Sequence, residues 1–179
     1  MDVPSSPDPI AEPTAYQDHL LSLIDDEDPA EVQAAAADGW RGLLAEAGEN
    51  ARIRPIPSEW SVIGCLGHAV DAEVVSAARY RWILAHHEPP LIGYDQDLWA
   101  DTLHGSDDED PEELLALFEP LRAANIALWA RSSEEDRARV GIHAERGPES
   151  FHLLFRMIAG HDRFHQAQAR RALDAIAGR

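Results

Sequence analysis

The stretch Gly160-His161-Asp162-Arg163-Phe164-His165 places two histidines four residues apart near the middle of the last long helical segment. Side chains at positions i and i+4 of an α-helix lie on one face, one turn apart. That face is apolar, because stepping back from His161 by threes and fours reaches Ile158, Leu154 and Phe151. The two imidazoles are therefore expected to face a core, where they either pair with polar groups or share a metal ion.

Four long segments have apolar residues at helical spacing and begin at recognisable caps. The expected helices cover about 29–47, 61–86, 111–131 and 151–177. Asp28 and Asp110 each precede a proline suited to a first helical turn, and Ser61 and Ser150 are the other expected caps. Because strand-like alternation is confined to a few residues near Val140, the sequence predicts an all-α four-helix bundle.

Shorter elements are expected to join or flank the four helices. Residues 16–24 are expected to form a short amphipathic helix, and 133–136 are expected to start one more helical turn. A long loop over 89–110, rich in aromatic residues, lies between the second and third long helices and is expected to fold over something. Residues 1–13 contain four prolines and predict a flexible tail, which leaves 14–179 as one domain.

Composition narrows the range of functions. The chain has 179 residues, 45% of them hydrophobic, and a net charge of −18. This charge repels phosphate backbones, so nucleic-acid binding is not expected. No apolar run reaches the ~18 residues of a membrane span, and the N-terminus lacks the features of a signal peptide, so no membrane partner and a cytoplasmic location are expected. The single cysteine excludes an internal disulfide and a cysteine-based zinc cluster.

A third metal ligand is needed, because two histidines rarely hold a divalent ion alone. On the helix that begins after Ser61, His68 lies on a largely apolar stripe with Cys65, Ala72, Val75 and Arg79. If this helix packs beside the last one, His68 converges with His161 and His165 and leaves coordination positions open, as in a catalytic site. By spacing alone, histidines hydrogen-bonded in a core or exposed at the surface are the commoner interpretation, and the metal site is the alternative.

Several motifs, in this order and at these separations, resemble the DinB-like superfamily of damage-inducible bacterial four-helix bundles. The resemblance extends over nearly the whole chain from about Thr14. The matching motifs are Glu59-Trp60-Ser61, Gly67-His68-Ala69-Val70-Asp71-Ala72-Glu73, the loop from Pro89-Pro90 to Trp99, and Gly160-His161-Asp162-Arg163-Phe164-His165-Gln166.

The resemblance implies a metal site and a class of reactions. The family's usual triad, one histidine on the second long helix and two on the fourth, maps to His68, His161 and His165. These residues would hold one divalent transition metal, such as zinc or nickel. Relatives include bacillithiol transferases and mycothiol-dependent maleylpyruvate isomerases, so the resemblance implies a thiol S-transferase or isomerase. Its partners would be a low-molecular-weight thiol and a small electrophile, and pairing of relatives through their helices suggests a homodimer.

Two alternatives to an enzyme are kept. One is a non-enzymatic stress-response bundle that binds a metal or a small ligand, and the other is a structural bundle whose histidines only form hydrogen bonds. No side chain is assigned as a catalytic acid or base. Asn125 either lines a pocket or forms a structural hydrogen bond. Tyr94, Asp97 and Trp99 either close the mouth of the pocket or anchor the loop.

The residues close to the expected ligands have less certain roles. Cys65 is expected to pack as a small apolar group. Asp71 and Glu73 are expected to be exposed helix carboxylates, with the alternative that one of them orients an imidazole. Asp162 lies about 100° around the helix from His161 and is expected to form a salt bridge or to face solvent. His143 is expected in a loop, without an assigned role.

Overall fold

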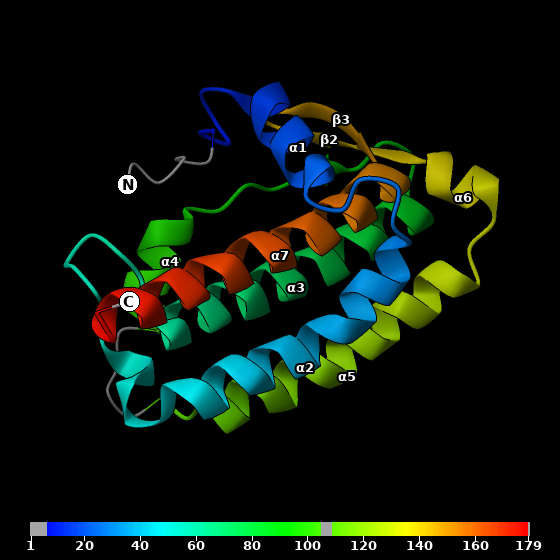
Figure 1. Ribbon diagram of the computed structural model, residues 1–179. Coiled ribbons are helices and arrows are strands. Elements are labelled where there is room, and N and C mark those ends of the chain that lie inside the picture. Colours follow the sequence, from blue (N-terminus) through cyan, green and yellow to red (C-terminus); the bar gives the residue numbers. More distant parts are fainter. Residues whose placement is uncertain (1–6, 105–108, 179) are drawn as a thin grey trace.

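The four predicted long helices form the body of the protein. A computed structural model describes residues 7–104 and 109–178, and in it helices α2 (Pro29–Ala47), α3 (Val62–Ala85), α5 (Pro111–Ala130) and α7 (Phe151–Ile176) make a four-helix bundle. Helices α3 and α7 lie side by side, with α2 and α5 along the opposite side of the bundle (Figure 1). The predicted fold class is confirmed.

The capping residues start the helices where the sequence predicts them. Asp28 accepts a hydrogen bond from the Ala30 amide, and Ser61 accepts one from the Gly64 amide at the first turn of α3. Asp110 and Ser150 cap α5 and α7 in the same way. Because each of these side chains satisfies a backbone N–H that the helix leaves free, the bundle helices begin at defined residues.

Four shorter helical elements in the described residues lie outside the four-helix bundle. Helix α1 (Pro13–Ser22) packs against α7, a 3-10 turn spans Gly48–Arg52, and α6 (Glu134–Ala138) starts at Ser133 with a capping box. The segment predicted as a long loop contains helix α4 (Gln96–Leu103), capped by Asp95. The loop prediction was wrong for these eight residues, because the side chain of Asp95 caps a short helix by accepting a hydrogen bond from the Leu98 amide.

A small sheet lies at one end of the bundle, where a loop was predicted. Strands β2 (Val140–His143) and β3 (Gly147–Ser150) form an antiparallel hairpin, and β1 (Pro90–Leu91) pairs in parallel with β2. Figure 1 shows α1 and this sheet covering the same end of the molecule. The hairpin brings His143 from the predicted loop onto a strand, where the side chain is buried.

Two clusters of apolar side chains fill the bundle. Trp40, Leu66 and Phe118 are fully buried in the first, and Tyr80, Phe151 and Phe155 are fully buried in the second, toward the sheet. Burial of large aromatic side chains supplies much of the hydrophobic stabilisation of a domain of this size. The two clusters fix the packing of α3 against α7 on both sides of the histidines.

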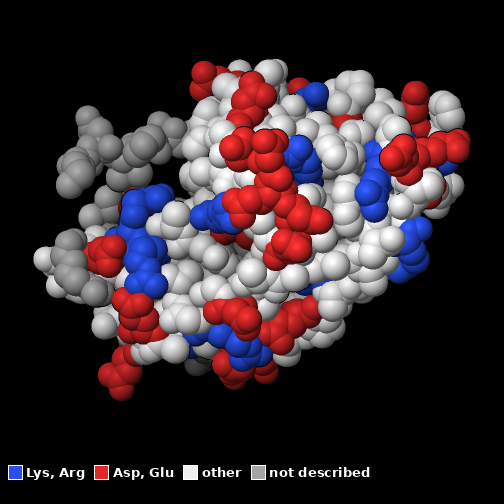
Figure 2. Space-filling view, turned by 45° about the vertical axis from the view of Figure 1, so that its right-hand side comes forward, with Lys and Arg blue, Asp and Glu red and all other residues white. Residues whose placement is uncertain are grey.

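The surface carries the negative charge expected from the composition. Acidic side chains form several groups over the face shown in Figure 2, with arginines among them. None of the helices in the described ranges is long and apolar enough to cross a membrane. Residues 1–6 of the predicted tail lie outside the described residues, and Asp8 accepts hydrogen bonds from the amides of Ile10 and Ala11 in a turn before α1. The division into tail and domain stays a prediction.

Candidate metal centre

Helices α3 and α7 bring three predicted ligands together. His68 lies two turns into α3, and His161 and His165 lie one turn apart near the middle of α7. One ligand atom from each imidazole lies within 4.8 Å of the other two. Each of the three residues is at most 6% exposed. The packing of α3 beside α7 thus creates the convergence that the apolar stripes predict.

The distances suit a divalent ion bound by nitrogen. The Nε2 atoms of His68 and His161 are 2.9 Å apart. Histidine nitrogens lie about 2.0–2.1 Å from zinc, so two nitrogens that share one ion lie roughly 3–3.5 Å apart. The same distance also fits a hydrogen bond between two neutral rings. The geometry therefore fits a metal site, and metal binding by these residues stays a prediction.

The protonation states favour metal binding. Burial, with the neighbouring imidazoles, holds the pKa values of His68 and His161 well below the ordinary value of 6.5. Burial also lowers the pKa of His165 to about 4. All three rings are therefore neutral at pH 7 and offer lone pairs, as divalent transition metals require. Protonation of one more ring nitrogen would place a positive charge in this buried site, and burial disfavours that charge.

Neighbouring side chains orient the rings. The Nδ1 atom of His165 lies 2.8 Å from Oε1 of Gln168, which accepts its hydrogen and leaves the lone pair on Nε2. The Trp60 ring stacks on His165, at 5.8 Å between centroids, and lies 4.9 Å from His68. The indole thus shields one side of the triad from water, and the amide sets the tautomer of one ligand.

A cavity of about 500 Å³ reaches the triad at His68 and His161. A cavity of this size accommodates a small molecule. Helices α3 and α7 line it mainly with apolar side chains, with Ser76 among them, and its walls also come from the turn before α1, from α1, from the segment around the start of α4 and from the hairpin. The apolar side chains between the two ends are Leu20, Ala72, Val75, Leu154, Met157 and Ile158.

The predicted pocket residues divide between the cavity and the scaffold. Tyr94 and Asp97 line the cavity. The Trp99 ring packs on Tyr94, at 4.6 Å between centroids, and so supports the wall without being part of it. Asn125 lies away from the cavity and donates a hydrogen bond of 2.7 Å to Glu73. Asn125 therefore forms a structural hydrogen bond and does not line this cavity.

The prediction that Asp71 and Glu73 are exposed was wrong. Asp71 accepts a hydrogen bond of 2.9 Å from His104, which also pairs with Glu109 at 2.6 Å. These hydrogen bonds, chiefly the one with Asp71, raise the pKa of His104 to about 9, so the ring is charged at neutral pH. The charged His104, which directly follows α4, thus holds this short helix against α3 through Asp71, one turn after His68.

Glu73 belongs to a buried ion network that contacts all four long helices. Arg122 on α5 lies 2.9 Å from Glu73 on α3 and binds both carboxylate oxygens of Asp162 on α7 at 2.5 and 3.1 Å. It also donates a hydrogen bond to the backbone of Gln33 on α2. The salt bridge considered for Asp162 is therefore present. Because Asp162 follows His161, this network holds α7 in the rotation that points His161 at His68.

Other residues left open by the sequence have defined positions. Cys65 is buried in the first apolar cluster, and burial raises the pKa of its thiol to about 12, so it packs as an apolar group as predicted. His143 lies at the end of the cavity away from the triad, 3.3 Å from Arg79. Sequence reasoning placed Arg79 on the α3 stripe without a role, and it did not identify Arg146, which lines the same end.

Comparison with known proteins identifies the family. Residues 17–169 match the DinB superfamily. The fold is similar to the solved structure of YfiT from Bacillus subtilis, described as a probable metal-dependent hydrolase with an unusual four-helix bundle topology. The TM-score is 0.75 at 18% identity, and the match covers 92% of this chain and 89% of that chain. No curated protein matches the sequence. With most of its length matched, the chain belongs to the DinB superfamily.

Proposed function

We propose that this protein binds one divalent transition metal, zinc, nickel or similar, through His68, His161 and His165, and uses it in a thiol S-transferase or isomerase reaction on a small electrophile. The observation that carries the proposal is a cluster of three neutral, buried imidazoles, two of which line one end of a cavity of about 500 Å³. When bound, such an ion lowers the pKa of a thiol that coordinates it and favours the nucleophilic thiolate.

The residues of the chain have distinct tasks in this proposal. The three imidazoles would hold the ion, and two of them, His68 and His161, also line the cavity. Gln168 keeps the Nε2 lone pair of His165 directed away from the amide, and Trp60 limits the entry of water beside that ring. The apolar middle of the cavity receives the hydrocarbon part of the electrophile. Water exclusion matters because, in a site without water, solvent does not compete with the thiolate for the electrophile.

The proposed use of a low-molecular-weight thiol favours one cellular compartment for the protein. Low-molecular-weight thiols stay reduced in the cytoplasm, which is where we place the protein. The single cysteine is buried and unreactive, so the thiol in the reaction comes from a co-substrate. A homodimer would leave this assignment unchanged, because all three proposed ligands belong to one chain.

The proposal is tested with a thiol panel. Zinc- or nickel-loaded protein is incubated with monochlorobimane and, in turn, with cysteine, glutathione, bacillithiol and mycothiol, and formation of the thioether is followed by fluorescence. We expect at least one thiol to react faster than without protein. Because a metal contributes several kcal/mol to such a barrier, the His68→Ala/His161→Ala/His165→Ala variant is expected to lose about 100-fold or more of this rate.

The matched control is His87→Ala, which removes an exposed histidine beyond the end of α3 and is expected to keep the full rate. Equal rates in the wild type and the triple variant for every thiol would contradict thiol transfer at this site. A parallel assay with p-nitrophenyl acetate and no thiol covers the activity named for YfiT. Metal-dependent ester cleavage without any thiol-dependent reaction would replace the transferase assignment by a hydrolase.

A further inference from the structure

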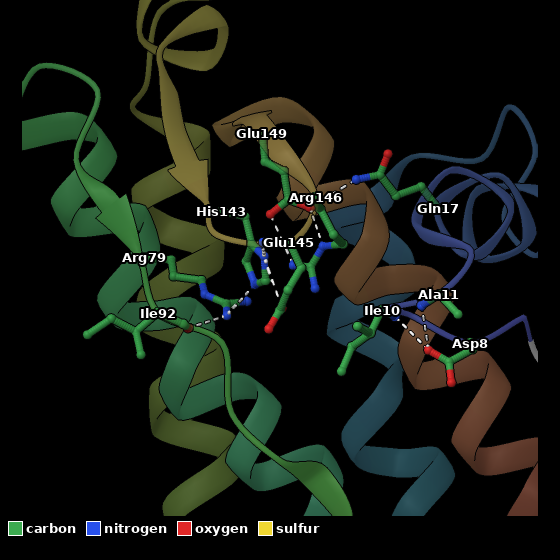
Figure 3. A network of polar contacts seen from close by, with 10 residues as sticks. All are labelled: Asp8, Ile10, Ala11, Gln17, Arg79, Ile92, His143, Glu145, Arg146 and Glu149. Atoms are coloured by element: carbon green, nitrogen blue, oxygen red, sulfur yellow. Dashed lines mark hydrogen bonds and ion pairs between the residues drawn. The ribbon is translucent and has the colours of Figure 1, made fainter.

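The end of the cavity opposite the triad holds a buried arginine. Arg79 lies eleven residues after His68 on α3, which corresponds to about 16 Å along the helix axis. Its side chain lines the cavity, and the residue is only 7% exposed. Figure 3 shows its guanidinium between the segment at Ile92 and the imidazole of His143. The triad and this arginine thus mark the two ends of one cavity.

The guanidinium of Arg79 has fewer partners than a buried cation needs. Its Nη2 donates a hydrogen bond of 2.6 Å to the carbonyl of Ile92 and lies 3.3 Å from Nε2 of His143. Its Nε is buried and without a hydrogen-bond partner. Within residues 7–104 and 109–178, no carboxylate forms an ion pair with Arg79. A buried charge without a counter-ion is costly, so this position favours an anion from outside the chain.

The charged groups that the structure describes near Arg79 do not supply a counter-ion for its guanidinium. Arg146 pairs with both oxygens of Glu149 at 2.6 and 3.0 Å, and Glu149 also accepts a hydrogen bond from Gln17 (Figure 3). The positive charge of Arg146 is therefore balanced. Burial, with Arg146 and Arg79 nearby, lowers the pKa of His143, which keeps this imidazole uncharged at neutral pH. Of the two arginines that line this end of the cavity in the described part of the chain, Arg79 is the one without a carboxylate in an ion pair.

The charge of an anion that would bind Arg79 can be narrowed. The acidic residues that also line the cavity are exposed at its rim: Asp8, Asp95, Asp97 and Glu145. These negative charges disfavour a dianion such as a phosphate monoester, whereas one guanidinium matches one monoanionic carboxylate in a bidentate pair. Between the two ends, the cavity is lined by the apolar residues Ala72, Val75, Leu154 and Ile158.

We propose that Arg79 binds the carboxylate of a small aliphatic carboxylic acid whose hydrocarbon chain crosses the apolar middle of the cavity. The assignment of the opposite end of this molecule as the reacting end, beside His68 and His161, rests on the function proposed above. Carboxylate binding at Arg79 does not require a metal. The substrate class is therefore a carboxylic acid with its reactive group several bonds away from the carboxylate.

The test measures binding of octanoate to the full-length chain after treatment with a chelator, by isothermal titration calorimetry. We expect wild-type protein to bind octanoate more tightly than octan-1-ol, which has the same chain and no charge, and more tightly than octyl phosphate. A charge-assisted bidentate contact contributes about 10–100-fold in affinity, so Arg79→Gln is expected to weaken octanoate binding by that factor. Binding of octan-1-ol should change little.

Two further variants separate binding from folding. Arg41→Gln removes the same charge from an exposed position on α2 and is expected to bind octanoate like the wild type. Arg79→Lys keeps the charge and is expected to bind octanoate better than Arg79→Gln. The proposal is overturned if wild-type protein does not bind octanoate, if octyl phosphate binds more tightly, or if Arg79→Gln weakens octanoate and octan-1-ol equally. Because no metal or thiol is present, failure of the thiol assay leaves this result intact.

Discussion

Replacing Gly160 by alanine is expected to destabilise the protein by about 2–3 kcal/mol, the upper part of the range for forcing an extra methyl group into a packed core. A Cβ atom at Gly160 would lie 2.0 Å from the carbonyl oxygen of Leu20 and 2.7 Å from the carbonyl carbon. These are backbone atoms, so helix α1 as a whole would have to move away from α7. The gain in helix propensity, about 1 kcal/mol, offsets only part of this cost.

Urea denaturation followed by circular dichroism measures the effect, and the thermal midpoint should fall by roughly 4–12 °C for a chain of this size. Gly42→Ala is the matched control. Gly42 also lies inside a long helix, but it is exposed and a Cβ there meets no atom within 4 Å. Its replacement should raise the free energy of unfolding by about 0.5–1 kcal/mol. Equal stability changes in the two variants would contradict the close contact between α1 and α7.

Replacing Arg122 by methionine is expected to cost about 3–5 kcal/mol, because removal of one partner leaves buried charges uncompensated. Methionine has a similar length but no charge. The variant would leave the carboxylates of Glu73 and Asp162 buried, with no cation between α3 and α7. The free energy of unfolding from denaturant titration measures the loss. Because Asp162 adjoins His161, weaker metal binding should accompany it.

An exposed arginine on the neighbouring helix supplies the comparison. Arg41 pairs with Glu119 at 2.7 Å, and about half of its side chain is exposed to solvent. Surface ion pairs contribute about 0–1 kcal/mol, so Arg41→Met should change the stability little. The variant Arg122→Met/Glu73→Gln/Asp162→Asn removes the unpaired charges and should recover part of the loss. Equal losses of unfolding free energy in Arg122→Met and Arg41→Met would contradict a larger contribution of the buried ion network to stability.

The parts of the structure that local sequence signals encode were predicted well. Asp28, Ser61 and Asp110 each cap a helix because a side-chain oxygen needs only a backbone amide two or three residues away. The spacing of His161 and His165 sets their common face by helix geometry alone. The apolar stripe of α3 predicted the convergence of His68 with this pair only if α3 packs beside α7, and the resemblance to the family implied the same three ligands.

The parts that depend on distant partners were missed. Glu73 is buried because Arg122 reaches it from another helix, and Asp71 is buried because His104 follows the unpredicted α4. One amino-acid sequence contains no local signal for ion pairs between distant residues, and aspartate and glutamate side chains are more often exposed than buried. The sheet was missed for a similar reason. Gly147 and Pro148 favour a loop when they are considered alone, and the partner strand β1 lies about 50 residues before β2 in the sequence.

The metal content of the purified protein tests the central claim most directly. The chain is expressed without a histidine tag, reconstituted with zinc or nickel, dialysed and measured by inductively coupled plasma mass spectrometry. His68→Ala is the decisive variant, because its imidazole comes from α3 while the other two come from α7. We predict close to one ion per chain in the wild type and in His87→Ala, and almost none in His68→Ala. No bound metal in the reconstituted wild type, or an undiminished content in His68→Ala, would contradict a three-histidine metal centre.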